Sequence, residues 1–296
     1  MFIFTTMSKS NFYSRIVAGT MTWGSWGKQL STAEMADLIH HCLEVGITTF
    51  DHADIYGDYG TEAHFGAAFS ASGVARETIQ LVSKCGIQMT SGRPNLVKHY
   101  QYDADYIIWS AEQSLKNLNT DYLDLFLLHR PSPLLESNEV EKAVSHLKEQ
   151  GKIKQFGVSN FSPSQIAVIS TNTPVEANQV EFSLTHTLPM EDGTFDDCLA
   201  NQRMAMSWSP LGNFFREDNP QNERISELMK KLTEKYGANE SQLLLAFILK
   251  HPAKVYPVVG TTNKQRLTDS IKAASIDLEL QDWFLLLEAA KGTPVP

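Results

Sequence analysis

Several kinds of segment are scarce or missing in this chain of 296 residues, and each absence narrows its class. It has only three cysteines, Cys42, Cys85 and Cys198, without Cys-x-x-Cys spacing, which argues against a disulfide-rich secreted protein and predicts reduced thiols. No run approaches the ~20 apolar residues that cross a membrane, and the apolar start, Met-Phe-Ile-Phe, is shorter than the apolar core of a signal peptide and has no basic flank. We therefore expect a cytoplasmic protein without a membrane partner.

Positive charge is also scarce. There are 25 Lys and Arg against 34 Asp and Glu, a net charge of −9, and this argues against nucleic acid as a partner. A local basic pocket for a phosphorylated cofactor remains compatible with that balance. The sequence has neither a Gly-x-Gly-x-x-Gly nor a Gly-x4-Gly-Lys motif, so it offers no phosphate loop of the Rossmann or P-loop kind.

What the chain does contain is a regular alternation of two patterns. A composition of 42% hydrophobic and 20% charged residues is that of a soluble globular protein, and the length suits one (β/α)8 domain, which typically takes ~250 residues. Eight short apolar runs are typical of buried parallel strands. They are residues 15–19, 47–51, 79–84, 123–128, 155–159, 176–180, 204–208 and 255–259. Helical patterns lie between them, so we predict an α/β protein, a (β/α)8 TIM barrel, in a single domain over residues 1–296.

The helical patterns also show where the chain exceeds a simple barrel. The predicted helices run from a capping box at Ser31 to about Val45, over 103–118 and 138–150, from Ser162-Pro163 onward, and over 225–236, 241–249 and 279–290. Two helical patterns precede the eighth strand and one follows its unit, which predicts two additional helices. Large loops are expected at the C-terminal face: 86–101, and 213–223 as a mobile loop over the pocket.

Four chemically distinctive residues follow three of the apolar runs: Asp51, Tyr56, Lys84 and His129. The C-terminal mouth of a barrel is where catalytic groups gather. Taken singly, each has an ordinary explanation, as a turn or cap residue, a packing aromatic, a solvated charge or a core histidine. Together they predict an acid–base catalyst, because an ammonium lowers the pKa of a nearby phenol, a carboxylate keeps the amine charged, and an imidazole can hold a substrate oxygen. Since no nucleophile with its own base is evident, we expect carbonyl reduction or alcohol oxidation with a cofactor that supplies hydride.

The text around these residues resembles the aldo-keto reductase family, and within it most resembles a bacterial YdhF-like branch. The matching segments are GITTFDHADIYG (46–57), LVSKCG (81–86), LDLFLLHRP (123–131), GVSNF (157–161), ANQVEFS (177–183) and SWSPLG (207–212). The resemblance runs from about Arg15 to the C-terminal helix. It implies an NADP(H)-dependent oxidoreductase that reduces a small aldehyde or ketone, with Tyr56 as proton donor, and it implies the two additional helices.

The resemblance also implies which residues bind the cofactor and the substrate. Ser159, Asn160 and Gln179 would hold the nicotinamide carboxamide, Trp208 would stack on the ring, and Ser209 and Leu211 would contact the pyrophosphate. Further cofactor contacts are expected from Thr22, Thr261, Lys264, Arg266 and Ser270. Gly260 stands where many members have a lysine, and Lys264 and Arg266 favour NADP(H) over NAD(H). The substrate would meet Trp23, Tyr56, His129 and Phe214, with Trp26, Ile55 and Asn213 as lesser candidates.

Two alternatives stay open. One is an NADPH-binding sensor subunit with slow turnover, resembling the potassium-channel β subunits, although no appended interaction segment supports it. The other is a metal-dependent barrel hydrolase using His52 and Asp54, but the His-x-His that usually begins such sites is missing, so we expect no metal. We expect a monomer or a weak homo-oligomer.

Overall fold

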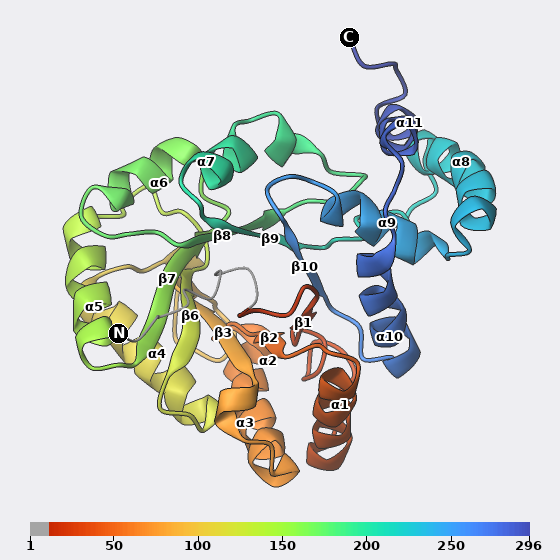
Figure 1. The fold of residues 1–296 in the computed structure, drawn as a ribbon. Coiled ribbons are helices and arrows are strands. Elements are labelled where there is room, and N and C mark those ends of the chain that lie inside the picture. Colours follow the sequence, from red (N-terminus) through yellow and green to blue (C-terminus); the bar gives the residue numbers. More distant parts are fainter. Residues whose placement is uncertain (1–11) are drawn as a thin grey trace, which may run out of the picture.

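Eight short parallel strands close into a barrel in the computed structural model, which describes residues 12–296 (Figure 1). In chain order the barrel strands are β1 (Val17–Gly19), β2 (Thr49–Asp51), β3 (Gln80–Cys85), β6 (Leu123–Leu128), β7 (Ile153–Ser159), β8 (Ala177–Glu181), β9 (Met204–Trp208) and β10 (Tyr256–Val259). Each pairs in parallel with its neighbours, and β1 closes the ring by pairing with both β2 and β10. The predicted (β/α)8 barrel is confirmed, and each predicted strand overlaps an observed one with ends within two residues. The apolar start of the chain lies outside the described residues.

Helices surround the barrel (Figure 1). They are α1 (Thr32–Glu44), α3 (Thr61–Ser72), α4 (Ala104–Leu118), α5 (Ser137–Glu149), α6 (Pro163–Ser170), α7 (Thr194–Ala200), α9 (Glu240–Leu249) and α10 (Lys264–Lys272), with short 3₁₀ turns at Arg76–Thr78, Leu188–Met190 and Ala273–Ser275. The capping box at Ser31 is present as predicted. Three helices, α3, α7 and α10, have no counterpart among the predicted ranges. In α3 small residues replace a clear apolar stripe, and Gly66 lets it approach α4 so closely that an added Cβ would lie 2.0 Å from the Asn117 carbonyl oxygen.

The two additional helices are α8 (Pro220–Tyr236) and α11 (Leu280–Lys291), which pack against each other beside the barrel (Figure 1). Asp282 of α11 accepts hydrogen bonds from Lys235 and Tyr236 at the end of α8. This confirms the predicted additions.

The loop predicted over 213–223 is shorter than expected. Helix α8 begins at Pro220 because Asn219 caps it, accepting a hydrogen bond from the Asn222 amide at 2.9 Å, and proline suits the first helical position. The other long segment, 86–101, is also more ordered than a loop. It contains a two-stranded antiparallel sheet of β4 (Ile87–Gln88) and β5 (His99–Tyr100).

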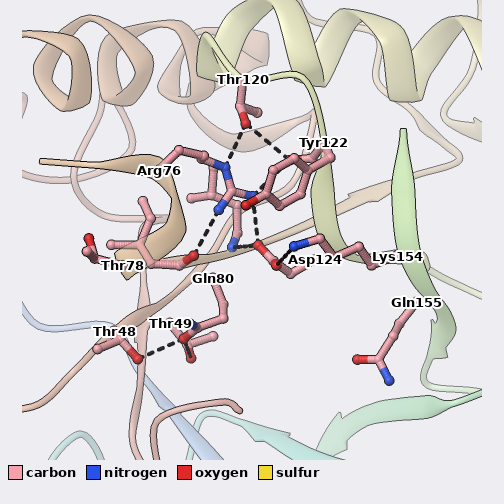
Figure 2. Close-up of polar contacts among 12 residues, drawn as sticks. Thr48, Thr49, Arg76, Thr78, Gln80, Thr120, Tyr122, Asp124, Lys154 and Gln155 are labelled. Carbon is pink, nitrogen blue, oxygen red and sulfur yellow. Dashed lines mark hydrogen bonds and ion pairs between the residues drawn. The ribbon is translucent and has the colours of Figure 1, made fainter. Parts of the chain in front are cut away.

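The N-terminal end of the barrel, opposite the predicted site, has its own charged cluster around Asp124 (Figure 2). Arg76 donates to the Asp124 carboxylate at 2.7 Å, and its guanidinium lies 3.9 Å from the centre of the Tyr122 ring. Lys154 lies 3.3 Å from the other oxygen of the same carboxylate. Asp124 is almost fully buried, so these cations compensate a charge that would otherwise destabilise the fold.

All three cysteines, Cys42, Cys85 and Cys198, are free and buried. Burial raises the pKa of the Cys42 and Cys198 thiols to about 12 and raises that of Cys85 well above its ordinary value. Within residues 12–296, no helix is long and apolar enough to cross a membrane.

Candidate active site

A buried ammonium group lies at the centre of the C-terminal barrel mouth. Strands β2 and β3 are parallel neighbours, so Asp51 at the end of β2 and Lys84 near the end of β3 emerge at the same rim. Lys84 Nζ lies 2.7 Å from Asp51 Oδ2, 2.7 Å from the His52 carbonyl oxygen and 3.2 Å from Tyr56 Oη. These three partners account for its three donors. The Lys84 side chain is fully buried, so these contacts compensate for taking the charge out of water.

Tyr56 reaches this ammonium from the short turn labelled α2 (Tyr56–Tyr59), which follows β2 after a tight loop and is not a regular helix, because Gly57 and Asp58 have left-handed backbones. Its amide donates to the Ala53 carbonyl oxygen at 3.1 Å. Its ring packs edge-on against His129, with ring centres 6.2 Å apart, and is partly exposed. The structure therefore brings together all four residues predicted as catalytic.

The environment sets the protonation of these groups. Burial raises the pKa of the Tyr56 hydroxyl, Lys84 opposes that effect, and the net direction is upward. The ammonium lowers the pKa of the Tyr56 hydroxyl as expected, but the loss of hydration, which was not anticipated, has the larger effect. For Lys84, burial alone would lower the pKa, but Asp51 and Tyr56 more than reverse it, so the amine stays charged. The site thus holds a protonated phenol against a protonated amine at neutral pH.

His129 follows β6 and is neutral. Burial lowers the pKa of its imidazole well below the ordinary value, and the positive charges of Lys84, Arg130 and Lys98 act in the same direction. Its amide donates to the Cys85 carbonyl oxygen at 2.8 Å, which fixes the backbone beside β3. Among the described residues no partner reaches its buried Nδ1 atom. A neutral imidazole at this position can donate or accept one hydrogen bond to an oxygen placed beside Tyr56.

A row of polar side chains continues from Asp51 across the mouth. Gln179 donates to Asp51 Oδ1 at 2.8 Å, and the Ser159 hydroxyl donates to the Gln179 carbonyl oxygen at 2.8 Å. The Asn160 amide donates to Ser159 Oγ at 2.8 Å, and Trp208 donates through its indole nitrogen to Asn160 Oδ1 at 2.8 Å. Strands β7, β8 and β9 are consecutive neighbours in the barrel, which explains this alignment. The sequence predicted these residues but not that Gln179 would hold Asp51.

Comparison with known proteins agrees with this geometry. The sequence matches the Aldo/keto reductase family over residues 15–290. The chain belongs to this family. It is 40% identical to Oxidoreductase YdhF of Escherichia coli, with 96% of each chain covered, and 36% identical to 6-dehydroglucose reductase of Agrobacterium fabrum, covering 95% of this chain and 96% of that one.

Solved structures show the same fold. The thermostable aldo-keto reductase Tm1743, in complex with the inhibitor epalrestat, superposes with a TM-score of 0.79 at 27% identity, covering 93% of this chain and 94% of that one. An aldo-keto reductase of Bombyx mori in complex with NADP superposes with a TM-score of 0.74 at 22% identity, covering 93% of this chain and 88% of that one.

In this aldo-keto reductase, the residues predicted to contact the rest of the cofactor, beyond its nicotinamide, have different hydrogen-bond partners and exposure. Thr22 donates to the Gly260 carbonyl oxygen at 2.8 Å, and Thr261 Oγ1 accepts from the Asn263 amide at 3.2 Å, so the hydroxyls line the rim between β1 and β10. Ser209 has a left-handed backbone, with φ of 48°, directly after β9, and Leu211 follows it partly exposed.

The first turn of α10 carries the two cations predicted for the phosphate. Arg266 is exposed there, where a helix N-terminus favours an anion. Lys264 is paired with Asp37 of α1 at 2.7 Å, so its charge is already partly neutralised. Ser270, predicted as a cofactor contact, is almost fully buried and donates to the Arg266 carbonyl oxygen at 2.8 Å. Its hydroxyl proton is therefore already used within α10, and a contact of Ser270 with the cofactor stays a prediction.

The predicted substrate aromatics also need a correction. Trp23 is 0% exposed and packs against Phe50 and Phe65, with ring centres 6.1 Å away in each case, so it belongs to the core and cannot meet a substrate. Trp26 is 37% exposed, and its ring centre lies 6.3 Å from that of Tyr56. Trp26, a lesser candidate in the sequence analysis, is therefore better placed than Trp23 to contact a substrate.

Phe214, the other predicted substrate aromatic, is only 8% exposed and packs into the apolar cluster beneath α8. The neighbouring Phe215 is 54% exposed, and their ring centres are 4.8 Å apart. Phe214 thus anchors this loop while Phe215 presents an apolar face to the solvent.

His52 and Asp54, which were considered as metal ligands, form hydrogen bonds with other side chains. His52 Nδ1 shares a hydrogen bond with Thr20 Oγ1 at 2.8 Å, its ring packs on Phe65, and burial lowers its pKa to about 3. Asp54 faces Tyr106 and Ser110 instead. In the described part of the chain, no group of three or more His, Cys, Asp or Glu side chains is arranged to hold a metal ion.

Proposed function

We propose that this protein is an NADP(H)-dependent reductase of small aldehydes or ketones in which Tyr56 gives a proton to the carbonyl oxygen. The observation that carries the proposal is the contact of a fully buried, charged Lys84 with the Tyr56 hydroxyl at 3.2 Å. A structural role alone would not require a buried ammonium beside a phenol at the C-terminal ends of the barrel strands, because burying a charge is costly even where partners compensate it.

Each residue has a role that follows from its state. Tyr56 holds its proton at neutral pH and faces the mouth, so it can give that proton to an oxygen that is gaining negative charge. Lys84 stabilises the phenolate that remains, and Asp51 keeps the amine charged. His129, neutral and beside the Tyr56 ring, can donate a hydrogen bond that places the same oxygen.

The residues of the mouth fit a nicotinamide cofactor. NADPH, when bound, supplies the hydride. Trp208 is partly exposed and is fixed by Asn160, so it offers a held aromatic plane on which a flat ring can stack. Asn160 and Gln179 are amides that match the donor and acceptor of a carboxamide. Arg266 offers an exposed guanidinium in the first turn of α10 for a phosphate, which favours NADP(H) over NAD(H).

The substrate class follows from what lies beside Tyr56. The exposed ring of Trp26 gives one wall that suits an apolar or sugar-like body, and the oxygen-binding groups Tyr56 and His129 suit a carbonyl. One relative, at 36% identity, is named 6-dehydroglucose reductase, so a panel of carbonyl compounds should include oxidised sugars.

The proposal is tested with Tyr56→Phe. We expect the wild-type protein to oxidise NADPH when aldehydes or ketones are supplied, and the variant to lose most turnover, because phenylalanine keeps the ring but has no proton to give. NADPH binding, followed by quenching of tryptophan fluorescence, should change little. Full activity in Tyr56→Phe would refute the assignment of the proton donor.

The sensor-subunit alternative predicts a different pair of results: tight NADPH binding and negligible turnover across the whole carbonyl panel. Steady multiple turnover with any member of the panel would exclude it.

A further inference from the structure

The backbone directly after Tyr56 is left-handed for three consecutive residues. The φ angles are 59° at Gly57, 53° at Asp58 and 69° at Tyr59. Gly57 suits this conformation, and a Cβ there would lie 2.4 Å from Thr61 Oγ1. Asp58 and Tyr59 have side chains, and the left-handed conformation is unfavourable for a residue with a Cβ. Such a turn persists only when its surroundings hold it.

The surroundings that hold it come from the segment between β4 and β5. Ser91 donates through its hydroxyl to Asp58 Oδ1 at 2.7 Å, and the Met89 amide donates to Tyr59 Oη at 2.9 Å. Both left-handed residues with side chains are therefore tied to the same segment, although that segment is about thirty residues away in the chain.

Arg93 completes this attachment. Its guanidinium lies 3.9 Å from the centre of the Tyr59 ring and 5.2 Å from that of Trp109 in α4, within the range of cation–π attraction. It also donates to Gln88 Oε1 at 2.7 Å, at the end of β4. The Arg93 side chain thus connects the turn after Tyr56, the segment between β4 and β5, and helix α4.

Beneath Arg93 is a cavity of about 160 Å³ whose lining includes Asp54 and Glu62. Asp54 is buried, and its Oδ1 atom accepts from the Ile55 amide at 2.7 Å, directly before Tyr56. Burial raises the pKa of Asp54 to about 8, Glu62 acts in the same direction, and the charge of Arg93 opposes both. Arg93 therefore also faces the residues on the N-terminal side of Tyr56.

We propose that Arg93 is a positioning residue for Tyr56, which clamps the left-handed turn through Tyr59 and so keeps the phenol within reach of Lys84. The inference rests on the proposed reductase function for its kinetic consequence, but not for its structural one. Arg93 itself would not touch substrate or cofactor, since its side chain is engaged by Gln88 and by the aromatic residues Tyr59, Tyr106 and Trp109. Because misplacement of a catalytic group by about 1 Å can lower the rate ~100-fold, loss of the clamp should appear in kcat.

The test compares two arginines that stack in the same way. Arg76 also lies 3.9 Å from a tyrosine ring centre, that of Tyr122, but at the opposite end of the barrel (Figure 2). We would prepare Arg93→Ala, Arg93→Lys and, as the matched control, Arg76→Lys, which keeps a cation beside Asp124. Three quantities would be measured: kcat and KM for a carbonyl substrate, Kd for NADPH, and amide hydrogen exchange in the peptide covering residues 54–62.

We expect Arg93→Ala to lower kcat by ~10- to 100-fold, to leave the Kd for NADPH within about twofold, and to speed exchange in residues 54–62. Arg93→Lys, which retains the charge, should recover part of kcat. Arg76→Lys should lower the melting temperature yet leave kcat and that exchange unchanged. Unchanged exchange and kcat in Arg93→Ala would overturn the proposal, and so would an equal loss of kcat in Arg76→Lys. If the wild-type protein turned over no carbonyl, the reductase function would fail while the exchange comparison still decided the clamp.

Discussion

Replacing Asp51 by asparagine should reverse the way in which stability depends on pH. In the native protein Lys84 Nζ is fully buried and lies 2.7 Å from Asp51 Oδ2. Asparagine has nearly the same shape but no charge. Its amide group would also face either Lys84 or the Gln179 amide, which donates to the other oxygen at 2.8 Å, so one donor would meet another donor.

The size of the stability loss in Asp51→Asn depends on the Lys84 charge, which stays buried without its partner. Removing one member of a buried ion pair typically costs about 3–5 kcal/mol, because the other charge remains buried without compensation. The native pKa of Lys84 is raised above its ordinary value of 10.5, so the stability it contributes is fully present below that pH and is lost as pH rises through the native pKa. In Asp51→Asn, burial becomes the dominant influence and lowers the pKa of Lys84 below 10.5. The unfolded chain then binds more protons than the folded one, so the stability of the variant rises toward pH 10.

Urea unfolding of both proteins between pH 7 and about 10, followed by tryptophan fluorescence, measures this difference. We expect a large gap in stability at pH 7 that narrows as pH rises. The matched control is Asp124→Asn, which leaves Arg76 with a weaker partner at the other end of the barrel (Figure 2). Arginine does not lose its proton in this range, so that gap should stay constant. A gap in Asp51→Asn that is independent of pH would show that Lys84 is not the charge whose burial matters.

Two further predictions concern residues away from this pair. Arg266→Ala should weaken NADPH binding more than NADH binding, because only NADPH carries the 2′-phosphate expected at the first turn of α10; an unchanged ratio of the two Kd values would reject the assignment. Asp54 has a pKa raised to about 8 in the folded protein, from an ordinary value of 3.8, so unfolding releases a proton between these values and stability should fall as pH rises from about 4 to 8. Asp54→Asn, which keeps an oxygen for the Ile55 amide, should reduce that slope; melting curves at pH 5 and pH 8 would measure it, and an identical slope would contradict the assignment.

The sequence predicted the barrel well because its strands are buried on both faces. Runs such as 123–128 are apolar at almost every position, and this is the pattern of a parallel strand between core and helices. Helix α3 escaped prediction because its small residues produce no clear stripe, and its place depends on Gly66 meeting α4, which only the folded chain brings near.

The residues of the candidate site could be predicted from the sequence, but their pKa values and their exposure could not. Asp51, Lys84 and Tyr56 were identified from their order after strands, but the direction of the pKa of Tyr56 depends on how completely the folded chain excludes water. The choice between Trp23 and Trp26 depends on the loop after β1, where the Lys28 amide returns to the Thr22 carbonyl oxygen at 2.8 Å. The contact of Arg93 with Tyr59 joins segments that are far apart in the chain, so no local sequence pattern predicts it.

The burial of Cys42, Cys85 and Cys198 has a practical consequence for labelling. Only a thiolate reacts readily with maleimides or iodoacetamide, and pKa values of about 12 leave Cys42 and Cys198 almost entirely as thiols at neutral pH. Cys85 is shifted in the same direction, and all three are shielded from solvent. A single cysteine introduced on the surface, for example in place of Leu96, which is 99% exposed, would therefore accept a fluorophore selectively without removal of the native ones, and would place a reporter on the segment between β4 and β5.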